Sequence, residues 1–360
     1  MKVKEILRAI DSFAPFKTAE KWDNSGLLIG DENADVKNVL IALDVTLDVI
    51  DDAVKQKCNL IITHHPVIFD PISKISVNDI QYKLIKNDIN IISAHSNLDM
   101  SPVGINAELA KAIGLQNVQL LSPISQLPYV TITVFVPKDY CEKVRTAMCH
   151  SGAGNIGDYS DCTFTVNGEG RFTPNDNANP FIGEKNITKV AEECEISCIC
   201  PQSKLNNVIN SMKSVHPYET PAYNVFENIT SYEKIGYGLM GTIDEISGND
   251  FAANVKKSLN VGMIRVVNGN KKVKKVAVLG GSGGNLIEDV IAQGADAFVT
   301  GDIKHNYMVE AFNKGLVLID AGHFATENIA LKSIAIRLSS MIPEVKFSVS
   351  NASVDPSEYI

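Results

Sequence analysis

Three short apolar runs decide the fold of the first third of the chain: NVLIALD at 38–44, NLIITHH at 59–65 and INIISAH at 89–95. Each run ends at polar residues, and helical patterns separate the runs. Short continuous apolar runs that alternate with helices are typical of strands buried in a parallel sheet. We therefore expect βαβ units in this part of the chain. The expected helices cover residues 2–13, 46–57, 77–87 and 103–113.

The last third of the chain repeats this pattern. KVAVLGG (275–281), AFVTGD (297–302) and LVLIDAG (316–322) are predicted to be buried strands, with helices at 284–293 and 326–340. Because both ends of the chain alternate in the same way, we predict an α/β fold. Its core would consist of two packed α/β halves with mainly parallel sheets.

The middle third has a different pattern. YVTITVFVP (129–137) alternates apolar and polar residues, which indicates an antiparallel strand. The expected order is βαβββαβ, with helices at 138–150 and 202–214 and a hairpin around Asn167 and Gly168. This order is that of a small ferredoxin-like α+β module, which we predict to be inserted between the two halves. The predicted domains are residues 1–125, 126–232 and 233–360.

The composition narrows the class of protein. The chain has 360 residues and a net charge of -9, so we expect no sequence-independent binding to nucleic acid or to an anionic membrane. The lysine cluster at 271–275 is read as a charged turn before a strand, with a nucleic-acid patch as the alternative. We find no secretion signal and no apolar run near ~18 residues. Seven cysteines without a C-x-x-C pair favour reduced thiols and a cytoplasmic location.

Polar residues follow several predicted strands. His64 and His65 end one strand, and Asp99 follows the next strand in AHSNLD. Ligands bind at this carboxyl edge in open parallel sheets. Adjacent histidines in an extended segment point to opposite sides. Both could therefore bind metal only if two metal ions lie close together, or if the chain turns after the strand, which Pro66 favours. The alternative is a pair of ordinary loop histidines.

A second signal is HFATE, in which His323 and Glu327 are four residues apart. On the first turn of a helix both side chains share one face. They would chelate a divalent cation there, or form a simple capping interaction. Together with the strand-end residues they make five ligands, which two divalent ions would share with positions left open for hydrolysis. The predicted metal ligands are His64, His65, Asp99, His323 and Glu327.

Other polar residues at strand ends are expected to orient ligands or bind substrate. His95 and His305 are candidates for a proton shuttle. GGSGG (280–284) is either a phosphate-binding loop or a tight turn between a strand and a helix. The remaining candidates are Asp44, Asn97, Asp302, Lys304 and Asp320.

At these motifs the chain resembles the Nif-three-like dinuclear-metal proteins, the GTP cyclohydrolase 1 type 2 homologs. The resemblance extends over WDNSGLLIG (22–30), ITHHP, SAHSNLD, GDIKH and DAGHFATE. SVHPYETPAYNV (214–225) is similar to a segment of the long form, whose middle domain resembles the PII and CutA proteins. The resemblance implies a homohexamer, with trimers formed through the inserted domain, and a two-metal centre on the five ligands above.

The leading functional hypothesis is a metal-dependent hydrolase that acts on a nucleotide-like or other phosphorylated small molecule, with GTP cyclohydrolase as the activity implied by the family name. Zinc, iron or manganese would suit the ligands. The alternative is a non-enzymatic metal-binding regulator or scaffold that senses a small ligand through the inserted domain. A nucleic-acid role is the third hypothesis, which the acidic charge disfavours.

Overall fold

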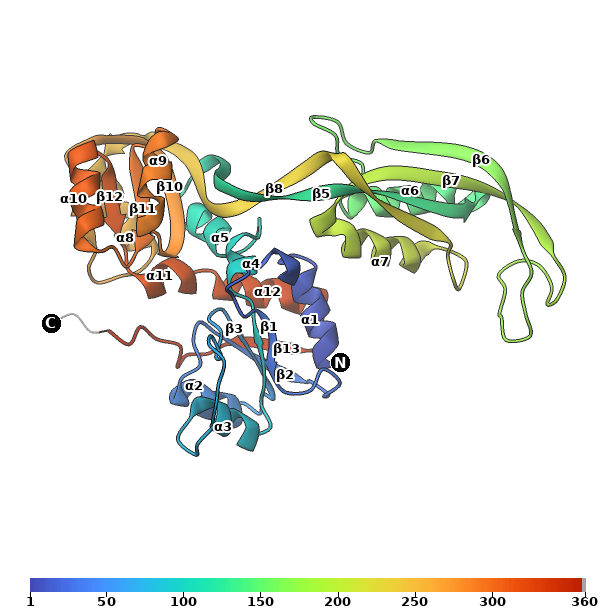
Figure 1. Cartoon of the computed structure of the whole chain (residues 1–360), viewed down its shortest axis with the longest axis horizontal. Helices are drawn as coiled ribbons and strands as arrows, with labels where there is room; N and C mark the ends of the chain where they lie inside the picture. The colour runs from blue at the N-terminus through green and yellow to red at the C-terminus, as the bar shows by residue number, and fades with distance from the viewer. Residues whose placement is uncertain (358–360) are drawn as a thin grey trace. The chain divides into compact units, whose positions relative to one another are not determined.

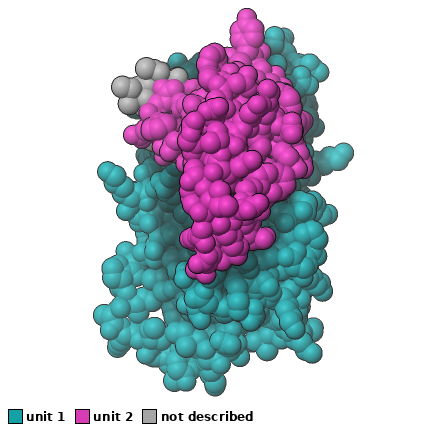
Figure 2. All heavy atoms as spheres, turned by 90° about the vertical axis from the view of Figure 1, so that its right-hand side faces the viewer, with its two compact units in different colours: residues 1–124, 235–360 teal, residues 125–234 magenta. Residues whose placement is uncertain are grey.

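A computed structural model describes residues 1–357, without the side chains of 125–127 and 229–233. The chain forms two compact units, coloured separately in Figure 2. Unit 1 contains both ends of the chain, residues 1–124 and 235–360, and unit 2 contains residues 125–234. No helix of the described residues is long and apolar enough to cross a membrane.

The first sheet of unit 1 has five strands in the order β1-β4-β3-β2-β13. Figure 1 labels β1, β2 and β3, from the start of the chain, together with β13, from its end. The expected strands are confirmed as parallel neighbours, and β1 is antiparallel at the edge. Parallel β13 extends the sheet from the far end of the chain. The strands are β1 (Gly26–Ile29), β2 (Asn38–Ala42), β3 (Leu60–Thr63), β4 (Asn90–Ser93) and β13 (Lys346–Val349).

Helices cover both faces of this sheet, because alternate residues of its strands are apolar on both sides. In β2, Val39 and Ile41 pack in one buried cluster with residues of α1 and α12, whereas Leu40 and Ala42 pack in another with residues of α2 and α3. The helices of this part of unit 1 are α1 (Val3–Asp11), α2 (Leu47–Lys55), α3 (Ile80–Lys86), α4 (Ser96–Asp99) and α12 (Leu331–Met341). The next helix, α5 (Ile105–Ala112), places Leu109 and Ala110 in the buried cluster of the second sheet.

The second sheet of unit 1 contains the expected C-terminal strands. β10 (Lys272–Ser282), β11 (Ala297–Gly301) and β12 (Val317–Asp320) are parallel, with β9 (Arg265–Val267) antiparallel to β12. The part of β8 (Tyr223–Ser247) within unit 1 pairs antiparallel with β10. The other helices are α8 (Gly248–Ser258), α9 (Ile287–Ala292), α10 (His305–Lys314) and α11 (His323–Asn328).

The two ends of the chain are packed together. Val3, Ile6 and Ile10 recur on one face of α1, and these residues share a buried cluster with Leu331 and Leu338 of α12. Burial of such side chains contributes roughly 1.5–3 kcal/mol each. This packing fixes the helix that follows the HFATE segment against the first sheet.

Unit 2 is built from β5 (Gln116–Pro137), α6 (Cys141–His150), β6 (Thr163–Phe172), β7 (Lys189–Pro201), α7 (Leu205–Val215) and β8. Short 3-10 turns precede both helices, at Lys138–Tyr140 and Gln202–Lys204. The strand order is β6-β7-β5-β8, and the two helices pack on apolar residues of β5 and β7. This strand-helix-strand-strand-helix-strand order has one strand fewer than expected and is that of ferredoxin-like modules. The likeness to PII and CutA, and the predicted domain division, stay predictions.

The expected hairpin at Asn167 and Gly168 is wrong. Both residues lie inside β6, where Asn167 pairs with Cys194 and Gly168 with Glu193 of β7. Neither has the positive φ that a two-residue hairpin turn of this sequence requires. Pairing along the whole of β6 therefore outweighs the local turn preference.

Candidate metal centre

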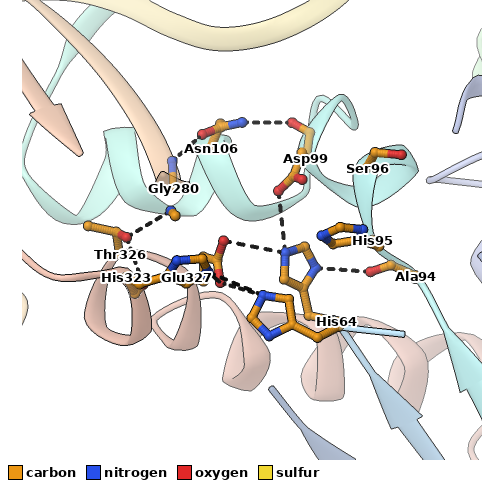
Figure 3. Close-up of polar contacts among 12 residues, drawn as sticks. His64, Ala94, His95, Ser96, Asp99, Asn106, Gly280, His323, Thr326 and Glu327 are labelled. Atoms are coloured by element: carbon orange, nitrogen blue, oxygen red, sulfur yellow. Dashed lines mark hydrogen bonds and ion pairs between the residues drawn. The ribbon is translucent and has the colours of Figure 1, made fainter. Parts of the chain in front are cut away.

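His64 and His65 follow β3 at the carboxyl edge of the first sheet. His64 is buried, and its Nδ1 lies 3.0 Å from the carbonyl oxygen of Ala94, to which it can donate. This leaves Nε2 as the available lone pair, 3.6 Å from Asp99 Oδ1 and 3.6 Å from Glu327 Oε1 (Figure 3). A hydrogen bond of this kind fixes the tautomer that a metal-ligating histidine needs.

His65 and His323 are oriented in the same way by carboxylates. His65 Nδ1 lies 2.8 Å from Asp44 Oδ1, and His323 Nδ1 lies 2.8 Å from Asp302 Oδ2. Their Nε2 atoms are 3.3 Å apart, and each lies 3.1 Å from Glu327 Oε2. The predicted partnership of His323 and Glu327 on one helix is confirmed, since α11 begins at His323.

The turn after β3 lets both adjacent histidines face the same site. The rings of His64 and His65 have centroids 5.0 Å apart and an interplanar angle of 45°. The difficulty expected for neighbours in an extended strand therefore does not arise, because both residues lie beyond the last strand residue, Thr63.

Asp99 and His95 come from the short helix α4. His95 is its N-cap residue and Asp99 is its last residue. The ring of His95 lies 5.0 Å from that of His64 and 5.6 Å from that of His65, and its Nδ1 lies 2.8 Å from Asp23 Oδ1. His95 is thus the fourth imidazole of the cluster, and Asp23 orients it.

These residues fit a divalent cation. His64 Nε2 and Asp99 Oδ1 are buried and have no hydrogen-bond partner. A buried polar atom without a hydrogen-bond partner or a bound ion lowers the stability of the folded protein. Two groups have ligand atoms that all lie within 4.8 Å of one another: His64 with His65 and His95, and His65 with His323 and Glu327. Imidazole and carboxylate together suit zinc, iron or manganese.

The electrostatics of the cluster favour positive charge. Burial opposes the charged form of His65, but Asp44 and Glu327 outweigh it and raise its pKa to about 10. The hydrogen bond to Glu327 raises the pKa of His323 to about 9. Burial raises the pKa of Asp99 to about 6, whereas the three imidazoles hold the pKa of Glu327 well below its usual range despite burial. The cluster therefore favours bound cations, either protons or metal ions.

The glycines of the GGSGG segment shape the site, a role that the sequence did not reveal. Gly280 N donates to Asn106 Oδ1 at 2.8 Å and Gly281 N to Thr326 Oγ1 at 3.0 Å, so these amides are already used by the protein. Gly281 has a φ of +69°, and a Cβ atom there would lie 2.2 Å from Glu327 Oε1. Asp23, Asn106 and Thr326 were likewise missed, because their roles depend on contacts between distant segments.

Four predicted residues do not point to the cluster. Asp320 Oδ2 pairs with Arg265 and accepts the amide of Ile303. Asn97 is buried and donates to the Ala14 carbonyl at 2.7 Å. Lys304 and His305 are exposed at the start of α10, and their side chains make no hydrogen bond or ion pair with the described residues. The structure thus brings His95, but not His305, to the cluster.

A cavity of about 460 Å³ opens beside the cluster. Asp44, His65 and Pro66 line one side of it, and residues 78–81 line the other. Nearby, the exposed rings of Trp22 and Phe69 lie 6.0 Å apart, and Trp22 contacts His95 edge-on at 6.0 Å. A small molecule would therefore have both room and an aromatic surface next to the cluster.

The fold and the cluster define a mixed α/β protein with a His/Glu site able to hold a metal ion at the carboxyl edge of its sheet. The sequence profile of the Duf34/NIF3 (NGG1p interacting factor 3) family matches residues 1–356. The chain belongs to this family, which confirms the resemblance inferred from its motifs.

Curated relatives of this chain carry the name GTP cyclohydrolase 1 type 2 homolog. One, from Bacillus subtilis (strain 168), is 39% identical over 352 residues and is matched over 94% of its length by 96% of this chain. Another, from Staphylococcus aureus (strain MRSA252), is 37% identical over 369 residues and is covered completely, as is this chain. The crystal structure of a Bacillus cereus protein related to NIF3 has a TM-score of 0.79 and 37% identity, over 100% of this chain and 99% of that one.

Proposed function

We propose that this protein holds two divalent metal ions through His64, His65, Asp99, His323 and Glu327, and hydrolyses a nucleotide-like or other phosphorylated small molecule. The observation that carries the proposal is a cluster of imidazole and carboxylate ligand atoms contributed by both ends of the chain, in which His64 Nε2 and Asp99 Oδ1 are buried without a hydrogen-bond partner. A pair of ions is favoured because the ligand atoms form two overlapping groups that share His65.

The residues around the cluster support hydrolysis. Bound divalent ions would act as Lewis acids and activate water. His95, held by Asp23, is placed to accept or return a proton beside the site, whereas His305 lies exposed and stays a weaker candidate. The cavity beside His65 would admit a substrate, and the rings of Trp22 and Phe69 would lie against a planar base. The printed names of the relatives point to GTP as the first nucleotide to test.

Metal content tests the first half of the proposal. Protein purified without chelator should carry two divalent ions per chain by elemental analysis, and His64→Ala should lose at least one of them. His150→Ala is a matched control, because that histidine is exposed in unit 2 and its ring bonds to Thr146 O of the same helix. A wild-type protein without bound metal after reconstitution with zinc, iron or manganese would overturn the proposal.

Turnover tests the second half. Metal-loaded protein is incubated with GTP and the release of formate is measured, then with other phosphorylated small molecules, followed through their hydrolysis products. Activity should disappear in His64→Ala and persist in His150→Ala. Equal activity in wild type and His64→Ala would assign the turnover to a contaminant and remove the hydrolase proposal.

A non-enzymatic regulator is the second candidate, and a large cavity in unit 2 favours it. Thermal-shift screening of metabolites would separate the two, because a ligand that stabilises the protein without being consumed indicates sensing. We also propose a homohexamer, with trimers through unit 2. Sedimentation at six times the chain mass is the expected result, and a monomer would refute this assembly.

A further inference from the structure

Unit 2 contains a cavity of about 440 Å³, within the size range of small-molecule sites. Its wall is formed by β6, by the loop that follows it, and by the segment after α7. None of the metal-cluster residues lines this cavity. It is therefore a separate site with its own chemistry.

Aromatic rings form the apolar part of this cavity. The ring of Tyr218 lies 5.6 Å from that of Phe172 and 6.4 Å from that of Phe181. Phe172 and Tyr218 are half-buried, and Phe181 is exposed. The rings make a partly open apolar surface, and Pro174 and Pro180 extend it. Aromatic faces carry partial negative charge and attract cations.

Carboxylates supply the polar part of the cavity. Glu193 Oε1 accepts the hydroxyl of Tyr218 at 2.7 Å, and a Cβ atom at position 170 would lie 2.1 Å from Glu193 Oε2. Gly170 thus leaves room for this carboxylate. Glu219 Oε1 accepts a hydrogen bond of 3.1 Å from the backbone amide of Asn179, and this bond fixes the loop beside the cavity.

The charges of the cavity do not cancel. Arg171 is 2.7 Å from Glu169, so this pair neutralises itself. Glu193 and Glu219 have no Lys or Arg partner among the described residues. Burial and Glu193 also raise the pKa of Tyr218, which keeps its phenol a neutral donor. Two carboxylates without a counter-ion beside aromatic faces disfavour phosphates and other anions.

We infer that this cavity of unit 2 binds a small organic cation, an amine with an aromatic or apolar body, through Glu193 and the rings of Phe172, Phe181 and Tyr218. The ammonium group would supply the counter-ion that Glu193 lacks, and the apolar body of the ligand would cover the exposed rings. This ligand class differs from the anionic nucleotide proposed for the metal cluster, so either site can fail without the other.

The test uses three probes that share an indole ring and differ in charge: tryptamine, tryptophol and indole-3-propionate. Isothermal titration of the full-length protein measures the affinity of each probe. We expect tryptamine to bind at least about 10-fold more tightly than tryptophol, because one charge-assisted contact contributes about 1.5–3 kcal/mol. Indole-3-propionate should bind more weakly than both.

Glu193→Gln should remove the preference for tryptamine and leave the affinity for tryptophol within about 2-fold. Glu192→Gln is the matched control, because this neighbouring carboxylate faces the other side of β7, is exposed and pairs with Lys138. Melting curves confirm that both variants are folded. Equal affinities for the three probes, no binding of any probe, or the same loss of tryptamine affinity in both variants would each overturn the inference.

Discussion

Replacement of Gly281 by alanine tests whether the glycine segment shapes the metal cluster. At this position the backbone has a φ of +69°, and the nearest atom to a new Cβ would be Glu327 Oε1 at 2.2 Å. The next residue it would contact is His323, whose Cε1 would lie 3.3 Å away. The added methyl group therefore meets two of the proposed ligands, whose positions it must change.

The expected magnitude has two parts. A left-handed backbone conformation costs an alanine roughly 1–2 kcal/mol, which lowers the melting temperature by about 2–4 °C per kcal/mol in a unit of this size. In addition, a contact of 2.2 Å lies more than 1 Å below ordinary van der Waals distance, so Glu327 must withdraw. Metal sites tolerate displacements of only about 0.5 Å, and we expect metal affinity to fall about 10- to 100-fold.

Gly114→Ala is the matched control, because Gly114 has a φ of +80° and a Cβ atom there would meet nothing within 4 Å. Both variants should lose stability, whereas only Gly281→Ala should lose metal affinity. Melting curves of the chelated proteins measure the first effect, and competition with a chromophoric chelator measures the second. The reasoning is refuted if Gly281→Ala binds metal as tightly as Gly114→Ala.

Two further predictions concern a support of the cluster and a buried histidine of unit 2. Asp302→Asn should weaken metal binding about 10-fold in the same competition assay, with little loss of stability, because asparagine tolerates the φ of 52° but lacks the charge that holds His323 Nδ1. Unit 2 should lose stability as the pH falls below about 6.5, because burial lowers the pKa of His216 in the folded protein. Only the neutral ring of His216 can both donate a hydrogen bond to Phe135 O and accept one from the amide of Tyr218. The loss should level off below the folded-state pKa, and melting curves of His216→Gln, which does not titrate, should lack this step; an identical pH profile in wild type and variant would contradict the assignment.

The strands of unit 1 could be predicted because burial on both faces requires continuous apolar runs. The cluster residues could be singled out by the same logic, since a polar residue directly after a buried strand lies at the edge where ligands bind. His64 and His65 come directly after β3, Asp99 ends the short helix α4 that follows β4, and His323 begins the helix that follows β12. Glu327 comes one helical turn after His323. Their role as ligands remains the proposal above.

The remaining features depend on contacts that local sequence does not encode. Asp23 supports the cluster because the folded chain places the loop before β1 beside His95. Gly281 shapes the cluster because the fold brings β10 close to Glu327. The prediction of a hairpin at Asn167 and Gly168 was wrong for a related reason. An Asn-Gly pair is a strong local turn signal, but ladder pairing with Cys194 and Glu193 across β6 and β7 decided the conformation.

The two strands that connect unit 2 with unit 1 explain how residues 125–234 can lie between the two segments that form the cluster. Within unit 1, β5 leaves beside the returning strand β8: a Cβ atom at Gly236 would lie 2.0 Å from Ser122 O, and Asn117 Nδ2 lies 3.3 Å from Thr242 Oγ1. Closing a loop whose ends already touch adds little to the conformational entropy lost on folding, since that loss grows only logarithmically with loop length. The ligands before and after the insertion therefore meet through unit 1 alone, because α1 packs on α12 and β2 pairs with β13. The cavity of unit 2 can therefore change without displacing a residue of the cluster, and the ligands proposed for the two sites can differ in charge.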